Sequence, residues 1–209
     1  MEDAALVVCP ECCRSLPLTE HASHKDNKVS GLFTDISKVE KAAAFCHYDH
    51  DTAFYRIIHA MKYFRQPQVG VWLGREAARH FMSENPQWFS GIDMIVPIPL
   101  HKKRLRQRLY NQSELIAEGV SKETGIAVDT RHLLRVVNNP TQTQRTTDER
   151  RANTEGIFDL KKGEELRGKH ILLIDDIVTT GSTLRSAISV LTPVRGLRVS
   201  ILTMGEAGK

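Results

Sequence analysis

The sequence lacks any long hydrophobic run, and its first residues do not resemble a secretory leader. A membrane-spanning helix needs about 20 predominantly apolar residues, and no such run occurs in the 209-residue chain. The start, MEDAALVVCPEC, has neither the basic segment nor the long apolar segment of a signal peptide. We therefore predict no membrane insertion and expect a cytoplasmic, globular protein, with 41% hydrophobic and 26% charged residues.

Cysteine is also scarce, with only four residues in the chain: Cys9, Cys12, Cys13 and Cys46. Without an export signal a disulfide framework is not expected, and the spacing Cys9-x-x-Cys12 is typical of half a metal site. Nothing in the first 40 residues supports a large core, so we predict an irregular arm at 1–41 and a main domain at 42–209. The net charge of +4 does not by itself indicate a nucleic-acid partner.

Two widespread nucleotide-binding motifs are absent. The chain has no G-x-x-x-x-G-K-S/T loop and no G-x-G-x-x-G loop. Receiver domains also carry adjacent acids after a strand, but on their first strand, and only 33 residues follow Asp176 here. The acidic pair Asp175-Asp176 therefore needs a different explanation.

The order of the expected elements predicts an α/β fold with a parallel sheet flanked by helices. Short apolar runs predict strands, and apolar residues at helical spacing predict helices. The expected strands are 42–48, 92–98, 126–137, 170–174 and 197–203. The expected helices are 52–64, one that starts near Val69 and ends before Asn85-Pro86, one that reaches residue 124, and 183–191. The polar stretch 138–156 is expected to be a functional or disordered loop.

Residues 171–184, ILLIDDIVTTGSTL, place two carboxylates directly after a buried run. If the strand ends at residue 174, Asp175 and Asp176 lie at its carboxyl end, where open α/β sheets bind ligands. Adjacent carboxylates repel each other unless cations or hydroxyl donors offset the charge, and the local chain supplies neither. A ligand with hydroxyl groups, such as ribose, or a sugar-bound Mg²⁺ would satisfy both acids.

The turn after these acids is suited to an anion. It lies at the start of the expected helix 183–191, where free N–H groups and the helix dipole favour negative charge. Gly181 allows close approach of the backbone, and hydroxyl donors surround it at Thr179, Thr180, Ser182 and Thr183. The alternative is an ordinary helix capped by serine or threonine. Acids and turn together predict a sugar-phosphate site.

Basic residues gather at two further places. Lys102, Lys103, Arg104, Arg106 and Arg108 follow the strand that ends at Pro97-x-Pro99, and could bind a pyrophosphate or form a solvated helix end. Arg145, Arg150 and Arg151 lie in the polar stretch, as phosphate contacts or as surface charge. Direct nucleic-acid binding would draw on the same residues, but no aromatic stacking platform is evident.

The segment IDDIVTTGSTL at 174–184 resembles the phosphoribosyl-pyrophosphate (PRPP) motif of type I phosphoribosyltransferases. Three more segments resemble the ComF family, the competence-associated branch of these proteins: VPIPLH at 96–101, IIHAMKY at 57–63, and R-x-x-N before G-x-F at 150–158. One departure concerns the family's R-G-F-N-Q, which here reads Arg108-Leu109-Tyr110-Asn111-Gln112. The resemblance covers roughly residues 6–205.

The resemblance implies a type I phosphoribosyltransferase fold in which Asp175 and Asp176 hold ribose hydroxyls and Thr179–Thr183 hold the 5′-phosphate of PRPP, with Mg²⁺. It further implies that 138–156 closes over the ligand. Two functions stay open: phosphoribosyl transfer to a nitrogen nucleophile, with segment 52–90 choosing the acceptor, or a non-catalytic PRPP or nucleotide sensor that supports DNA uptake through competence proteins or single-stranded DNA. A homo-oligomer is compatible with either function.

The resemblance also implies structural zinc in the N-terminal arm. ComF-like proteins begin with two C-x-x-C pairs, whereas one pair, Cys9 and Cys12, is present here. Zinc takes four ligands, and the candidates to complete the set are Cys13, His21, His24, Cys46, His47 and His50. Cys46 and His47 lie in an expected strand, where core or surface placement is the simpler interpretation. The alternative is an irregular arm with unpaired thiols.

Overall fold

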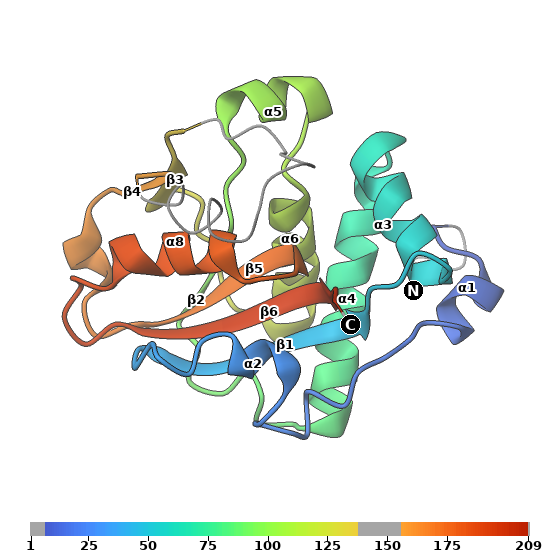
Figure 1. The fold of residues 1–209 in the computed structure, drawn as a ribbon, viewed down its shortest axis with the longest axis horizontal. Helices are drawn as coiled ribbons and strands as arrows, with labels where there is room; N and C mark the ends of the chain where they lie inside the picture. The colour runs from blue at the N-terminus through green and yellow to red at the C-terminus, as the bar shows by residue number, and fades with distance from the viewer. Residues whose placement is uncertain (1–6, 138–155, 209) are drawn as a thin grey trace.

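A four-stranded parallel sheet forms the centre of the protein (Figure 1). The computed structural model describes residues 7–137 and 156–208. Its strands lie in the order β1 (Val39–His47), β6 (Arg198–Glu206), β5 (His170–Val178) and β2 (Met94–Pro97), and every neighbouring pair is parallel. The predicted parallel α/β architecture is therefore confirmed.

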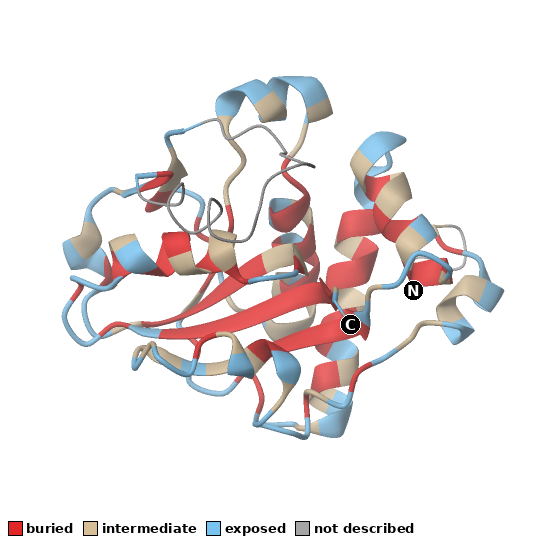
Figure 2. Ribbon diagram, in the orientation of Figure 1, coloured by how far each residue is buried: buried red, intermediate tan, exposed pale blue. Residues whose placement is uncertain are grey.

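Helices cover both faces of this sheet, because alternate strand residues point to opposite sides. On one face, Ala43, Phe45 and Leu172 pack in a core cluster with α3 (Ala53–Tyr63), α4 (Pro67–Glu84) and α6 (Gln112–Thr124). On the other face, α2 (Lys28–Gly31) and α8 (Ser182–Leu191) cover a second cluster that contains Ala42 and Ala44. Figure 2 shows the buried residues concentrated along the strands and the inner helix surfaces.

Two glycines set the position of α6 against α4. A Cβ atom on Gly74 of α4 would lie 2.0 Å from the carbonyl oxygen of Ile116 on α6. A Cβ atom on Gly119 of α6 would lie 2.1 Å from the carbonyl oxygen of Val71. The two backbones therefore approach more closely than any side chain allows. This contact fixes α6, whose first turn lines the site described below.

The basic run forms a short helix of its own, α5 (Lys102–Arg108), before α6 begins. Leu109 ends α5 in the left-handed conformation, with φ of 71°. This is the position where the ComF pattern has glycine, which adopts that conformation without steric cost. Leu109 therefore adopts the left-handed backbone conformation that glycine would adopt at this position. Asn111 then caps α6, since its side chain accepts a hydrogen bond from the Ser113 N–H.

The predicted strand over 126–137 is largely wrong. Only Leu133–Arg135 forms a strand, β3, which pairs antiparallel with β4 (Phe158–Leu160) in a separate two-stranded sheet. Val128 makes just an isolated bridge to Ile95. The apolar run is interrupted because the Asp129 carboxylate accepts hydrogen bonds from the N–H groups of Arg131 and His132, which turns the chain.

The strand expected at 170–174 is longer than predicted. Pairing of β5 with β2 stops at Ile174, opposite Pro97, but pairing with β6 continues as far as Val178. The two acids therefore lie inside β5, beyond the point where its neighbour β2 has ended. This leaves them exposed to a hollow on the β2 side, at the carboxyl edge where a ligand site was predicted.

The N-terminal arm contains α1 (Pro10–Arg14) and α2. Elsewhere in the chain, Gly163–Leu166 forms a 3₁₀ turn, η2, before β5. Val29 and Phe33 are buried in the second core cluster, so the arm contributes to the main core. The boundary at residue 41 stays a prediction. Among the residues that the structure describes, no helix combines the length and the apolar character needed to cross a bilayer.

Candidate functional site

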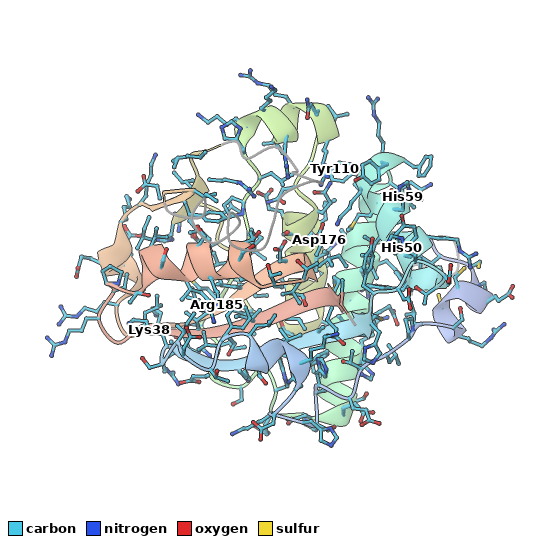
Figure 3. All side chains as sticks on the ribbon, viewed as in Figure 1. Lys38, His50, His59, Tyr110, Asp176 and Arg185 are labelled. Carbon is cyan, nitrogen blue, oxygen red and sulfur yellow. The ribbon has the colours of Figure 1, made fainter. Side chains whose placement is uncertain are left out.

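The acidic pair at the end of β5 already has partners from distant parts of the chain. The Lys62 ammonium on α3 lies 2.8 Å from Oδ2 of Asp176, and the Ser113 hydroxyl on α6 donates to Oδ1 of Asp175 at 3.2 Å. The local chain supplies no offsetting group, as predicted, but α3 and α6 do, so a ligand is not the sole partner of these acids. Figure 3 shows Asp176 at the end of β5 on the side that faces α3.

The two carboxylates still differ from ordinary surface acids. Burial, and then the negative charge of Asp176, raise the pKa of Asp175 to about 7. Burial alone would lower the pKa of Lys62, but its attraction to Asp176 and the hydrogen bond between them raise it above the ordinary value. One ammonium thus holds two adjacent acids together, and Asp175 is charged only part of the time near neutral pH.

The turn after β5 leaves the start of α8 open. Its N-cap is Gly181, with φ of 71°, and no side chain caps the helix, so the alternative of a serine- or threonine-capped helix is wrong. Thr179 and Thr180 are exposed, and Ser182 and Thr183 are half-buried. A Cβ atom at Gly181 would lie 3.0 Å from the Phe33 ring. No described side chain therefore occupies the N–H groups at the start of α8, where an anion would bind.

A cavity of about 240 Å³ joins the acids to a cluster of cations. Arg104 and Arg108 on α5 and Arg135 on β3 line it together with Asp175 and Asp176. A smaller hollow lies over the turn, lined by Thr179, Gly181, Ser182 and Thr183, and it shares Asp175, Ile177 and Thr183 with the larger cavity. Acids, turn and arginines thus surround two adjoining hollows that share part of their walls.

The basic residues predicted for pyrophosphate divide into two groups. Arg104 and Arg108 line the cavity, whereas Lys102 and Lys103, like Arg106, are exposed on α5 and are not among the lining residues. A pyrophosphate role for the two lysines stays a prediction. The predicted loop contacts Arg145, Arg150 and Arg151 lie outside the residues that the structure describes, and their role stays a prediction as well.

Arg135 was missed by the sequence reasoning. Its Nε has no hydrogen-bond partner among the described residues, and its guanidinium lies over the Phe158 ring at 5.5 Å. Burial, and then the nearby charge of Arg104, lower its pKa. The signal was a lone arginine within the apolar run LLRVV, where a charged residue has to serve a purpose beyond packing.

Gln112, at the start of α6, also lines the cavity, and Tyr110 in the linker before it holds that linker in place. Gln112 is 1% exposed, and its Nε2 has no hydrogen-bond partner among the described residues, although its Oε1 accepts from Arg108 at 3.1 Å. The Tyr110 hydroxyl donates to the carbonyl oxygen of Met61 at 2.5 Å, which ties this linker to α3. A buried amide with spare donors is a further indication that a polar ligand occupies the cavity.

The predicted zinc arm is not confirmed. Cys9 is exposed and its sulfur caps α1 by accepting from the Cys12 N–H, while Cys46 is buried in β1 as the simpler interpretation had it. Burial raises the pKa of Cys46, which opposes the thiolate that a metal requires. Across residues 7–137 and 156–208, no three side chains of histidine, cysteine, aspartate or glutamate assemble into a metal-binding group. Zinc at Cys9 and Cys12 stays a prediction.

An aromatic ladder, in which each ring contacts the next, runs along α3. Ring centroids are 4.6 Å apart for His50 and Tyr55, 5.8 Å for Tyr55 and His59, and 4.5 Å for His59 and Tyr63. Phe64 extends the ladder at 5.8 Å from His59, and Figure 3 labels His50 and His59 on this side of the molecule. The spacing 55, 59, 63 was the sequence signal, because residues four apart share one face of a helix.

Comparison with known proteins gives a consistent picture. The phosphoribosyl transferase domain family matches residues 114–207. The DNA utilization protein YhgH of Salmonella typhimurium is 30% identical over 61% of this chain and 56% of its own length, and the competence protein ComFC of Bacillus subtilis is 39% identical over 45% and 36%. The chain thus spans about half the length, or less, of these two relatives.

Among solved structures, an adenine phosphoribosyltransferase from Saccharomyces cerevisiae is similar, with a TM-score of 0.44 and 16% identity over 69% of this chain and 72% of that one. A further relative by sequence, competence protein F of Haemophilus influenzae, is 33% identical over 44% of this chain and 41% of its own length. The fold is that of the type I phosphoribosyltransferases, with its parallel sheet flanked by helices. Residues 114–207 therefore match the phosphoribosyl transferase domain family, and the chain is similar to relatives named ComFC, competence protein F and YhgH.

Proposed function

We propose that this protein binds PRPP with Mg²⁺ in the cytoplasm and transfers its phosphoribosyl group to a nitrogen nucleophile, releasing pyrophosphate. One observation carries the proposal: two adjoining hollows bring together an acidic pair, an uncapped helix start and a set of arginines. PRPP presents the complementary groups in one molecule, namely ribose hydroxyls, a 5′-phosphate and a pyrophosphate.

Each part of the ligand has a proposed partner. Asp175 and Asp176 accept hydrogen bonds from the ribose hydroxyls, and the N–H groups and hydroxyls of Thr179–Thr183 hold the 5′-phosphate. The pyrophosphate lies among Arg104, Arg108 and Arg135, whose charges stabilise it as it departs. Two adjacent carboxylates alone suit Mg²⁺ poorly, but they suit a Mg²⁺ ion held mainly by ligand oxygens, which would offset the ligand's charge.

Calorimetric titration with PRPP and Mg²⁺ tests this assignment. We expect wild-type binding, and we expect Arg135→Gln to weaken PRPP and pyrophosphate about 10- to 100-fold while ribose 5-phosphate affinity changes little, since charge-assisted arginine–phosphate contacts are strong and local. Arg106→Gln, on exposed α5 outside the lining, is the matched control. No PRPP binding by the wild type would contradict the proposal. Pyrophosphate release with a panel of bases and amines then distinguishes an enzyme from a sensor.

The aromatic ladder favours a second candidate function, contact with single-stranded DNA. Tyr63 is 60% exposed and Phe64 66% exposed, and the Arg108 guanidinium lies 5.7 Å from the Tyr63 ring centre. Exposed rings beside cations are the combination that holds unpaired nucleic-acid strands. The names of the relatives, DNA utilization protein and competence protein, support contact with DNA as well.

Fluorescence anisotropy with a labelled oligothymidine checks this candidate. The double variant His59→Ala/Phe64→Ala is expected to bind about tenfold or more weakly, because stacking contributes about 1–3 kcal/mol per base, and affinity should fall as salt rises. Leu18→Ala removes a side chain of similar exposure, 44%, away from α3 and serves as the control. Equal affinities for the ladder variant and the control would refute a stacking surface.

A further inference from the structure

A second cavity, of about 470 Å³, lies apart from the acids and the turn. Its walls come from the arm at 21–27, the start of β1 at Lys41 and Ala42, and the turn after α4 that holds Asn85, Gln87 and Trp88. It shares no lining residue with the cavity at Asp175. In the sheet register, Lys41 of β1 pairs with Ser200 of β6, and Ser200 pairs with Leu172 of β5. The two cavities therefore open at different positions along the strands and at different edges of the sheet.

The side chains that line this cavity include cations and no carboxylate. Its lining contains Lys25, Lys41, His21 and His24 and no carboxylate. Lys25 and Lys41 form no ion pair with any residue that the structure describes. Glu40, the chain neighbour of Lys41, is instead 3.2 Å from Arg198 and 3.5 Å from His170.

Lys41 is held at the cavity wall. Its ammonium lies 4.7 Å from the centre of the Trp88 ring and donates a hydrogen bond to the Trp88 carbonyl oxygen. The residue is half-buried, so its charge is partly withdrawn from water. The Trp88 carbonyl oxygen and ring offset part of the cost of burying this cation, and a bound anion would offset more of it.

The remaining walls are rigid and supply further donors. The Trp88 ring is 4% exposed and packs against Phe81 and Phe89, each at 4.7 Å between centroids. His21 accepts a hydrogen bond at Nδ1 from the Ala44 N–H, which leaves its proton on Nε2 as a donor. Asn85 donates to the carbonyl oxygen of Ala22 and fastens the arm to the end of α4. The cavity is therefore a built feature of the fold.

We propose that this cavity is a second ligand site, which binds the phosphate group of a small phosphorylated molecule of about mononucleotide size against Lys41 and Lys25. The volume falls within the roughly 300–1,000 Å³ of small-molecule sites, and it exceeds what a free phosphate ion fills. Two ammonium groups that form no ion pair within residues 7–137 and 156–208 match the double negative charge of a phosphate monoester.

Tryptophan fluorescence reports on this site directly. The chain has two tryptophans, so Trp72→Phe leaves Trp88 as the only emitter. We expect AMP to change the Trp88 emission, inorganic phosphate to do so more weakly, and adenosine to have no effect. The Trp88 response to AMP should persist when Asp175→Asn, which removes an acid of the other cavity, is added to the Trp72→Phe variant. Loss of the response in that background would place AMP in the other cavity and overturn the proposal.

Variants of the two lysines complete the test. Lys41→Met keeps the apolar stem on Trp88 and is expected to weaken AMP at least tenfold. Lys25→Gln alters an exposed residue and is expected to weaken AMP several-fold. Lys122→Gln, exposed on α6, is the control and should leave the affinity unchanged. Absence of any AMP response, an equal response to adenosine, or unchanged affinity in Lys25→Gln would each overturn the site.

Discussion

Replacing Asp175 with asparagine is expected to abolish PRPP binding and, at pH 8, to make the protein more stable. Asparagine has the same shape and keeps the Oδ1 acceptor that the Ser113 hydroxyl and the Asp176 N–H use. It removes the negative charge that burial and Asp176 disfavour. The charge is therefore retained at a cost to folding, which is expected of a residue that serves a ligand.

The pH dependence of this effect follows from the raised pKa. The folded state holds the Asp175 proton up to about pH 7, whereas the ordinary value of the carboxyl is 3.8. Stability from this group is therefore fully present below about pH 4 and is lost as pH rises to about 7. Asp175→Asn escapes that loss. We expect a gain of about 2 kcal/mol at pH 8, less than the full shift because cavity solvent reaches the carboxylate, and no gain near pH 4.

Denaturant unfolding at both pH values, with PRPP titration alongside, measures this result. Asp176→Asn is the comparison, because it removes the partner of Lys62 and should destabilise the protein at pH 8. If the Asp175→Asn variant were less stable than the wild type at pH 8, this would contradict the inference that the Asp175 charge lowers the free energy of unfolding. Unchanged PRPP affinity in the same variant would remove Asp175 from the proposed ribose site.

Lys62→Met is expected to cause the largest loss of stability, about 3–5 kcal/mol at pH 8. The Lys62 and Asp176 side chains are only 18% and 17% exposed, and their separation is 2.8 Å. Without the ammonium, the two adjacent acids form no ion pair with any other residue that the structure describes. Their pKa values must then rise, so the loss should shrink as pH falls and one acid takes up a proton.

The control for this prediction is Lys122→Met, which makes the same substitution in an exposed ion pair with Glu118, four residues away on α6. That pair is expected to contribute about 0.5 kcal/mol. The double variant Lys62→Met/Asp176→Asn should recover most of the stability, because the acid left without a partner is then neutral. Similar losses for Lys62→Met and Lys122→Met, or no recovery in the double variant, would show that the pair does not hold the acids.

Much of the fold could be predicted because neighbouring residues decide it. The apolar run at 171–174 and the helical spacing from Phe54 to Met61 appear in the structure as β5 and α3. The strand predicted over 126–137 was wrong because a side chain, Asp129, bonds the local backbone and outweighs the apolar pattern. The end of β5 was misplaced because β6, a strand far along the chain, continues the pairing.

The sequence by itself determined the acidic pair, its place after a buried strand, and the glycine turn that starts α8, since these features lie within one short segment. Only the tertiary structure decided what surrounds them. Lys62, Ser113 and Arg135 reach the site from three separate elements. Their meeting depends on strand order and on the close glycine contact between α4 and α6, which no local pattern specifies. The local sequence specifies the acidic pair and the turn, and long-range packing brings the other polar and charged groups to them.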